Sequence, residues 1–375
     1  MPYKYLYIDD TKDDIETGTI NGLQDGDEIL VNFKKPSNWE NLIEELINIL
    51  PEYNGIILDL RLNDNPYEDG RFAHYKGSTV AQELRSLSKE NKIEDLPIIL
   101  YSGTYNIEHY LDNTSLDLFD AVVDKNKLEH PNYMTFYGFR KKLKWLSDGY
   151  EFIKKSEGNI NAVLNVTDLS FIDLRFVELF QELLTKPVHI ISRFLEKQVI
   201  FKPSFLIDEN YLSARLGIDR NSADWIPFID AYLKNSEYSG AFSNYYRRWW
   251  MYLVDKFWNE QISLDFPLRN ISASKRIELI IQKTGFKNLQ PIGKQSKSKS
   301  DSFWVVCKAT NVAIDTVDGF TISGQDAKYP WQEPQYISID EALRPTGTYE
   351  VSTMEKPRLQ KLKEVFEKNE QRIRK

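Results

Sequence analysis

The segment NGIILDLRLN, residues 54–63, decides the fold that we predict for this chain. Its apolar run is short, rich in Ile and Leu and preceded by Gly55, which is typical of a strand buried on both faces of a parallel sheet. The run ends on a single carboxylate, Asp59. Because open parallel sheets place their chemistry at the carboxyl ends of strands, Asp59 is a candidate functional residue. An aspartate at a strand end can also do no more than cap the next turn.

Three other apolar segments are also followed directly by polar residues. We expect strands at residues 3–8, 96–101 and 119–123. The residues that follow them are Asp9 and Asp10, then Ser102 and Gly103, then Asp124 and Lys125. In a doubly wound α/β sheet such strand ends converge on one edge. The prediction is therefore a crevice that holds carboxylates, a hydroxyl and an ammonium group.

This combination of side chains suits phosphoryl transfer. Carboxylates within a few ångströms of one another repel, and together they form a hard oxygen site suited to Mg²⁺. Magnesium would neutralise the incoming phosphoryl oxygens and allow an aspartate to act as nucleophile. A lysine adds a positive charge beside the transferred group, and a small hydroxyl hydrogen-bonds one of its oxygens.

These residues, in this order along the chain, resemble the receiver domain of two-component response regulators. The resemblance covers residues 1–130 and implies a flavodoxin-like doubly wound α/β fold. The matching residues are Asp9 and Asp10 for the acidic pair, Asp59 for the phosphoacceptor, Ser102 for the switch hydroxyl and Lys125 for the lysine. A histidine kinase or a phosphotransfer protein is then the implied partner and phosphoryl donor.

The resemblance also implies a set of Mg²⁺ ligands. Asp10, Asp59 and the main-chain carbonyl of Arg61 would bind the metal directly, and Asp9 would bind it through water. The phosphoryl group on Asp59 would be bound by Ser102 and Lys125.

The chain departs from the family pattern in three places. The loop from Arg61 to Lys76 is longer than the usual connection after the phosphoacceptor strand. Val122 stands where an aromatic residue is common, and Asn126 stands where a proline commonly follows the lysine. The chemistry should survive these changes, whereas the usual coupling of phosphorylation to an aromatic side chain is put in doubt. The long loop is the alternative carrier of the signal.

The bulk composition is that of an ordinary soluble globular protein. The chain has 375 residues, of which 41% are hydrophobic and 28% charged. A single cysteine, Cys307, excludes an internal disulfide framework, and four scattered histidines exclude the usual zinc motifs. No apolar run approaches membrane-spanning length, and the first predicted strand begins almost at the N-terminus. We therefore expect a cytoplasmic protein without a signal peptide or a membrane partner.

The formal net charge of −8 is unevenly distributed. Residues 1–130 hold 12 Lys and Arg against 26 Asp and Glu, whereas residues 131–375 hold 36 against 30. Crowded acidic surface loops are the simpler interpretation. Intramolecular docking of the two parts, or a nucleic-acid-facing second part, is the alternative.

We expect three parts in the chain. Residues 1–130 form the receiver, and residues 131–157 form a long connecting helix that begins at Pro131. Residues 158–375 form an α+β domain of unknown type, which acts in output or interaction.

Within the last part, periodicity predicts several elements. They are strands at 162–166 and 303–308, and helices at 177–184, 188–196, 226–233, 244–258, 274–284 and 357–375. The helix at 244–258 is dense in Tyr and Trp, which favours a core or a partner groove over stacking on nucleic-acid bases. No phosphate loop, GxSxG or HExxH motif occurs here, so enzymatic activity outside the receiver pocket stays open.

The sequence thus predicts a response-regulator-like signalling protein that relays phosphorylation of Asp59 to a C-terminal protein-interaction domain, with a homodimer as one outcome. Receivers without a recognisable output also occur as phosphate sinks, including in kinase-based antiphage systems of the Detocs type, which this chain loosely resembles. A phosphorylation-controlled DNA-binding regulator is the other alternative, and it draws on Lys294, Lys297 and Lys299.

Overall fold

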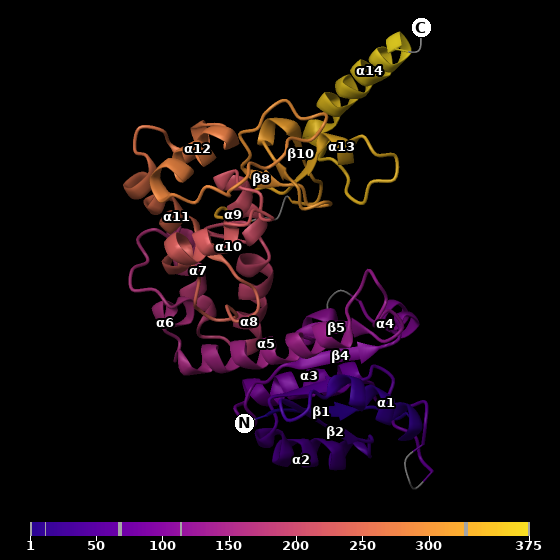
Figure 1. Ribbon diagram of the computed structural model, residues 1–375. Coiled ribbons are helices and arrows are strands. Elements are labelled where there is room, and N and C mark those ends of the chain that lie inside the picture. Colours follow the sequence, from indigo (N-terminus) through magenta and orange to yellow (C-terminus); the bar gives the residue numbers. More distant parts are fainter. Residues whose placement is uncertain (1, 12, 67–69, 113–114, 326–328, 374–375) are drawn as a thin grey trace. The chain divides into compact units, whose positions relative to one another are not determined.

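The computed structural model describes residues 2–11, 13–66, 70–112, 115–325 and 329–373 (Figure 1). The chain divides into two compact units. The first unit comprises residues 1–167, 177–195 and 240–245, and the second comprises residues 168–176, 196–239 and 246–375. The predicted domain boundary at residue 158 stays a prediction, because each unit collects several separate segments.

A five-stranded parallel sheet forms the centre of the first unit (Figure 1). Its strands are β1 (Tyr3–Ile8), β2 (Ile29–Lys34), β3 (Gly55–Leu58), β4 (Ile98–Ser102) and β5 (Ala121–Asp124). Their order in the sheet is β2-β1-β3-β4-β5, and every neighbouring pair is parallel. This order is that of the flavodoxin-like doubly wound fold, so the predicted fold class is confirmed for this part.

Five helices accompany the sheet. They are α1 (Asp13–Leu23), α2 (Trp39–Ile49), α3 (Gly77–Lys89), α4 (Thr104–Tyr110) and α5 (Phe136–Lys155), with short 3₁₀ turns at Leu50–Glu52 and Ser115–Leu118. The prediction that α5 begins at Pro131 is wrong. Its N-cap is Thr135, whose hydroxyl accepts a hydrogen bond from the Gly138 N–H at 3.1 Å. A side-chain cap satisfies one of the free N–H groups of the first turn, which fixes the helix start there.

The two faces of the sheet carry different layers, because successive strand side chains point to opposite sides. One face presents Leu6, Ile56, Leu58, Ile98 and Leu100, which pack in one core cluster with buried side chains of α2 and α3. The opposite face presents tyrosines to α5. The Tyr5 hydroxyl donates to the main-chain carbonyl of Leu143 at 2.8 Å, and the rings of Tyr101 and Phe139 lie 5.6 Å apart.

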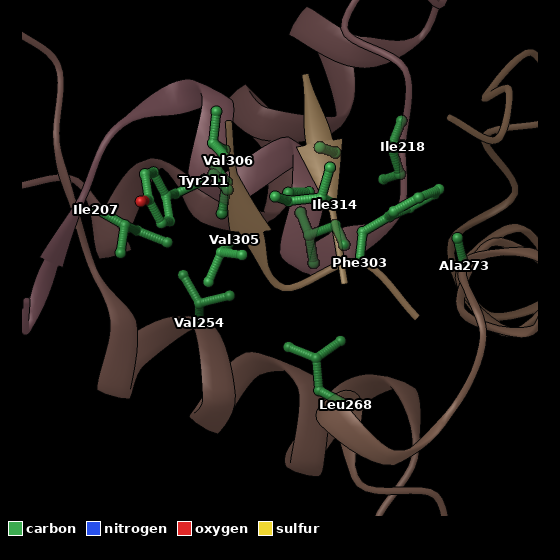
Figure 2. Close-up of a cluster of buried hydrophobic side chains, with 14 of the residues drawn as sticks. Ile207, Tyr211, Ile218, Val254, Leu268, Ala273, Phe303, Val305, Val306 and Ile314 are labelled. Carbon is green, nitrogen blue, oxygen red and sulfur yellow. The ribbon is translucent and has the colours of Figure 1, made fainter. Parts of the chain in front are cut away.

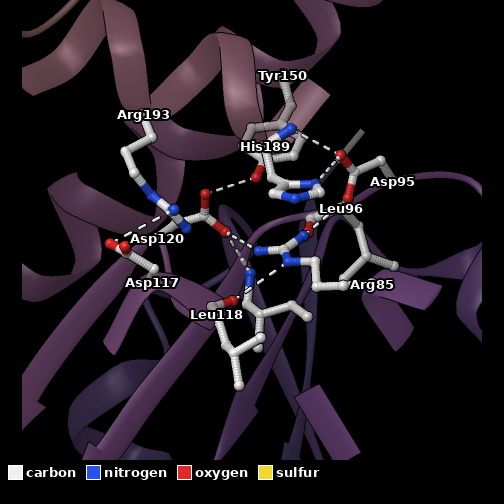
Figure 3. A network of polar contacts seen from close by, with 10 residues as sticks. Arg85, Asp95, Leu96, Asp117, Leu118, Asp120, Tyr150, His189 and Arg193 are labelled. Carbon is white, nitrogen blue, oxygen red and sulfur yellow. Dashed lines mark hydrogen bonds and ion pairs between the residues drawn. The ribbon is translucent and has the colours of Figure 1, made fainter. Parts of the chain in front are cut away.

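A buried polar network lies at the amino ends of strands β4 and β5 (Figure 3). Arg85 of α3 lies within 2.7 Å of both Asp95 and Asp120. The Tyr150 hydroxyl of α5 donates to Asp120 at 2.6 Å, and His189 contacts Asp95 through its main-chain N–H at 2.6 Å and Nδ1 at 2.8 Å. The network therefore joins α5 and the later helix α8 (Val188–Leu195) to the five-stranded sheet.

The first unit also contains α6 (Ile160–Leu164), where the sequence predicts a strand over 162–166. That prediction is wrong. Asn159 caps the helix by accepting from the Ala162 N–H at 3.1 Å, and Asn165 ends it in the left-handed conformation with φ of 51°. An apolar run this short has no periodicity that separates a strand from a helix, so the caps decide.

The second unit is built from short helices and two-stranded antiparallel sheets. Its strand pairs are β6 (Leu206–Ile207) with β7 (Trp249–Trp250), β8 (Val305–Val306) with β9 (Ala313–Ile314), and β10 (Gly319–Thr321) with β11 (Tyr336–Ser338). Its helices are α9 (Glu209–Leu216), α10 (Trp225–Phe228), α11 (Met251–Phe257), α12 (Ala273–Thr284), α13 (Ile339–Ala342) and α14 (Lys356–Ile373), while α7 (Leu174–Leu183) belongs in part to each unit. Figure 2 shows Val305, Val306 and Ile314 among side chains of α9 and α11 in the core of this unit.

The aromatic segment predicted as one helix over 244–258 is divided. Trp249 and Trp250 form β7, α11 follows, and a π-helical turn continues over Trp258–Ile262. Trp249 and Trp258 are fully buried, in agreement with the core interpretation.

Cys307 is also buried, and its sulfur accepts a hydrogen bond from the Ser338 N–H at 3.3 Å. No helix in the described ranges is both long and apolar enough to cross a bilayer.

Candidate phosphoryl-acceptor site

The predicted site residues lie at one edge of the sheet, at the carboxyl ends of its strands. The Asp59 N–H donates to the carbonyl of Ile8 at 2.9 Å, which sets the end of β3 beside the end of β1. The Lys125 N–H donates to the carbonyl of Ser102 at 2.8 Å, which does the same for β5 and β4. Parallel pairing therefore carries residues distant in sequence to a common edge.

Three of these residues meet directly. The Lys125 ammonium lies 2.5 Å from Asp9 Oδ2 and 2.8 Å from Asp59 Oδ1. The side chain of Asp9 is 2% exposed and that of Asp59 is 8% exposed. One cation therefore compensates two buried carboxylates.

Hydrogen bonds from neighbouring residues hold the carboxylates of Asp59 and Asp9 in place. Asp59 Oδ2 accepts from the main-chain N–H of Arg61 at 2.7 Å. Asp9 accepts from the N–H of Thr11 at 2.9 Å and from the hydroxyls of Thr11 and Tyr7. Groups held this way need little rearrangement before they react, which is the basis of preorganised catalysis.

Asp10 is directed differently from the other two carboxylates. Its Oδ2 accepts from the main-chain N–H groups of Asp64 at 2.5 Å and Asn65 at 2.7 Å, so that it anchors the long loop that follows β3. The Arg61 side chain is ion-paired with Asp64 in the same loop. Residues 67–69 of this loop lie outside the described residues.

The electrostatics of the site favour an additional cation. Burial raises the pKa of the Asp59 carboxyl to about 6; Lys125 opposes this rise, and the charge of Asp9 adds to it. Burial also acts to raise the pKa of Asp9, but Lys125 and the hydrogen bonds from Thr11 and Tyr7 outweigh it and hold the pKa below its usual value. The charge of one lysine is shared by two acids, which is an incomplete compensation.

The residues predicted as ligands carry oxygen atoms that suit Mg²⁺, but these atoms do not converge on one point. Carboxylate oxygens and a main-chain carbonyl are the hard ligands that this ion takes. Within the part of the chain that is described, no three His, Cys, Asp or Glu side chains are arranged as a ready metal site. Asp9 and Asp59 converge on Lys125, and Asp10 is held by the loop. The predicted metal ligands Asp9, Asp10, Asp59 and Arg61 thus stay a prediction.

Ser102 is the last residue of β4 and is fully buried. Its hydroxyl has no hydrogen-bond partner among the described residues. Beside it, the Thr104 hydroxyl donates to Asp124 at 2.6 Å and the Thr104 N–H donates to Asn126 at 2.9 Å, so the loops after β4 and β5 are tied together. A buried hydroxyl without a partner is costly, so Ser102 is a candidate donor to a polar group that binds at this site.

The sequence did not point to an aromatic shell around Lys125. Its ammonium lies 5.1 Å from the ring centre of Tyr101 and 5.8 Å from that of Tyr7. The two rings are 6.0 Å apart, and Tyr101 also contacts Phe139 of α5. The signal was present in the alternation of KYLYI and LPIILY, which places Tyr5, Tyr7 and Tyr101 on one sheet face.

A second omission is Gly77, the first residue of α3. A Cβ atom on this residue would lie 2.0 Å from the main-chain oxygen of Asp59. The Gly77 N–H donates to the carbonyl of Leu60 at 2.9 Å, so the close approach is part of the regular structure. Only glycine allows α3 to begin this near Asp59.

Comparisons with known proteins bear on the first unit only. No protein-family model matches the chain, and no curated protein matches it. A sensor protein from Polaromonas sp. JS666 matches at 16% identity and a TM-score of 0.28, over 39% of this chain and 96% of its own. The BeF3-activated receiver domain of Klebsiella pneumoniae RstA matches at 17% identity and a TM-score of 0.26, over 38% and 97%.

A structure of histidine kinase ThkA in complex with response regulator protein TrrA also matches, at 23% identity and a TM-score of 0.26, over 38% of this chain and 97% of that chain. The fold assignment itself rests on the strand order and on the residues at the strand ends. The N-terminal two-fifths of the chain is thus similar to receiver and response-regulator domains, and the C-terminal half has no named match.

Proposed function

We propose that the first unit is a receiver that accepts a phosphoryl group on Asp59. The observation that carries the proposal is the Lys125 ammonium between Asp59 and Asp9, at the edge of a parallel sheet whose strand order is that of the doubly wound fold. An Asp59 oxygen attacks the phosphorus of a phosphohistidine; the new O–P bond forms as the N–P bond breaks, and the imidazole leaves as the neutral base after taking up a proton.

Each neighbouring residue has a role in this step. Lys125 already contacts Asp59 and would bind an oxygen of the transferred group, where its charge stabilises the added negative charge. Ser102 has a buried hydroxyl that would donate to another phosphoryl oxygen. Asp9, Asp10, Asp59 and the main-chain carbonyl of Arg61 would hold Mg²⁺, which neutralises phosphoryl oxygens when it is bound.

The proposed partner is a histidine kinase or a histidine-containing phosphotransfer protein. A receiver aspartate takes its phosphoryl group from a phosphorylated imidazole, and one of the matched structures holds a response regulator protein with a histidine kinase. We further propose that the second unit is a protein-interaction domain that responds to this phosphorylation. Its cores of buried aromatic side chains form an ordered domain that can carry such a surface.

The test is intact-mass analysis after incubation with Mg²⁺ and acetyl phosphate, and then with a phosphorylated phosphotransfer protein. We expect wild type to gain one phosphoryl group and Asp59→Asn to gain none. Asp124→Asn is the matched control, because Asp124 is a buried carboxylate at the same sheet edge that contacts Thr104 instead of Lys125. Equal phosphorylation of Asp59→Asn and wild type, or no phosphorylation of wild type by either donor, would contradict the proposal.

A further inference from the structure

The second unit contains a pocket with a volume of about 300 Å³, at the lower end of the range for small-molecule sites. It lies between the residues that follow the turn at Glu196–Ile200, the start of α9, and the segment after β8. Its charged lining consists of Lys202, Asp208, Arg248 and Lys308. Neither the receiver chemistry nor any sequence motif accounts for this concentration of positive charge.

Arg248 is the buried member of this lining, with 9% of its surface exposed. Its Nε donates to the carbonyl of Ile200 at 2.7 Å, and one terminal nitrogen donates to the carbonyl of Arg247 at 2.8 Å. No carboxylate among the described residues forms an ion pair with it. Neutral carbonyls hold the guanidinium in place. The charge of Asp208 acts on it without forming an ion pair, so the compensation is incomplete, which is costly for a buried group.

Another buried arginine of the same unit shows the contrast. Arg215 is 1% exposed and donates to both carboxylate oxygens of Glu333 at 2.7 Å. Arg215 therefore has its counterion within the fold. Arg248 is also buried but borders a pocket and has no such ion pair among the described residues, which indicates that a ligand in the pocket supplies the counterion.

The two lysines of the pocket add to this charge. Lys202 is half-buried and Lys308 is exposed, and neither forms an ion pair with a carboxylate of the described residues. The one acid in the lining, Asp208, is the N-cap of α9 and accepts from the Tyr211 N–H at 2.9 Å. Three cations against one acid leave the pocket with a net charge of about +2 at neutral pH.

We propose that this pocket binds a small phosphate monoester. A phosphate monoester carries a charge of about −1.5 to −2 at pH 7 and three acceptor oxygens, which matches the charge of the pocket. The planar guanidinium of Arg248 suits two phosphate oxygens, and the lysines act as point charges. Asn311 and Gln335, which also line the pocket, offer amides to the rest of the ligand, and Phe201 offers an aromatic ring that is 38% exposed.

The proposal is tested by isothermal titration of the full chain with adenosine monophosphate, ribose 5-phosphate, inorganic phosphate and unphosphorylated adenosine. Magnesium is left out, so that binding at the receiver site is not promoted. We expect at least one of the two monoesters to bind and adenosine not to bind. If both monoesters bind and adenosine does not, the pocket recognises the phosphate group. If only one monoester binds, the amides and Phe201 also select the rest of the ligand.

Two substitutions place the binding in this pocket. Loss of a charge-assisted hydrogen bond is worth roughly tenfold or more in affinity, so Arg248→Gln should weaken binding of the monoester by at least that factor. Lys308→Ala should weaken it several-fold, and because Lys308 is exposed this variant tests the proposal even if Arg248→Gln does not fold. Lys283→Ala, an exposed lysine on α12 away from the pocket, is the matched control.

Failure of both monoesters to bind wild type at millimolar concentration would overturn the proposal. So would unchanged affinity in Lys308→Ala and Arg248→Gln, or equal affinity for adenosine and its monophosphate. Binding of inorganic phosphate alone, without either monoester, would show an adventitious ion only.

Discussion

The side chain of Asp59 combines burial with partial compensation of its charge. Burial raises the pKa of this carboxyl to about 6, so it is largely ionised at pH 7, which is the form that the proposed attack on phosphorus requires. Asp9 lies on the other side of Lys125 and shares its charge. An incoming cation would therefore improve the compensation, and it would also offset the negative charge that a phosphoryl group adds.

The hydroxyl of Ser102 allows a direct test of its proposed role at the site. Because its buried hydroxyl has no partner, Ser102→Ala should leave the free energy of unfolding unchanged or raise it by about 1 kcal/mol. The same variant should reduce phosphorylation of Asp59 if, as we propose, the Ser102 hydroxyl binds an oxygen of the phosphoryl group. Urea denaturation and intact-mass analysis measure the two effects.

Ser213→Ala is the matched control, since this buried hydroxyl donates to the carbonyl of Ile218 at 2.6 Å. It should lower the free energy of unfolding by about 1 kcal/mol, because it leaves an acceptor without its donor. If Ser102→Ala were as destabilising as the control, the hydroxyl would have a partner in the fold, and its assignment to the phosphoryl group would lose its support.

Among the elements, the start of α3 is the most constrained by the site. Gly77→Ala places a methyl group against the main-chain oxygen of Asp59, and main-chain atoms cannot rotate away. We expect a loss of about 1–3 kcal/mol in the free energy of unfolding, the usual range for overpacking. Phosphorylation should also slow, because the strand end that carries Asp59 must shift.

Gly18→Ala on α1 is the control for this substitution, because nothing lies within 4 Å of the added Cβ. Alanine in a helix interior is better than glycine by about 0.5–1 kcal/mol, so this variant should be slightly more stable than wild type. Thermal denaturation of the pair compares them; equal stabilities of the two variants would contradict the close approach at Gly77.

The buried network around Arg85, at the amino ends of β4 and β5, leads to a prediction about how the stability of the protein depends on pH. Burial acts to raise the pKa of Asp95, but the hydrogen bond with His189 and the charge of Arg85 outweigh it, so the pKa lies below its usual value. A carboxyl with a lowered pKa in the folded state stabilises the protein above its unfolded pKa of about 4 and loses that contribution as the pH falls through the folded value.

Asp95→Asn should therefore be less stable than wild type by about 1–3 kcal/mol at pH 7, since a charge-assisted bond to Arg85 and one to His189 are weakened. The difference should stay constant down to about pH 5 and shrink below about pH 4. Chemical denaturation at several pH values measures it. A difference that grows towards low pH would contradict the sign of the shift.

For the whole molecule, the sequence allowed the first unit to be predicted far better than the second. Four apolar runs with polar residues at their ends define a parallel sheet, because buried strands and their order along the chain leave few topologies. Tyr101 and Gly77 escaped this reasoning, since their roles depend on which atoms approach them after folding.

In the second unit the strands are only two or three residues long, and helices continue into π turns. Segments such as 244–258 bury aromatic rings on several sides, so no single period marks them. Its core nevertheless follows ordinary physics: large apolar side chains from many short elements gather in one cluster.

Relay and phosphate sink differ at the scale of the whole molecule. If phosphorylation is relayed to the second unit, as we propose, acetyl phosphate with Mg²⁺ should change the hydrodynamic size or the assembly of wild type and leave Asp59→Asn unchanged. Size-exclusion chromatography with light scattering measures this. Full phosphorylation with no change in size or in partner binding would favour a sink.

The buried network around Arg85 also limits how this protein can be divided or recombined. Asp95 and Asp120, which precede β4 and β5, are hydrogen-bonded to His189 and Tyr150, and both of these partners lie beyond residue 130. Phe242, later still, packs against Trp145 and would clash with any side chain at Gly149. A fragment cut at residue 130 would leave two acids at the starts of β4 and β5 without these partners. A fragment that ends at residue 130 is therefore expected to be less stable than the whole first unit, which includes these later segments.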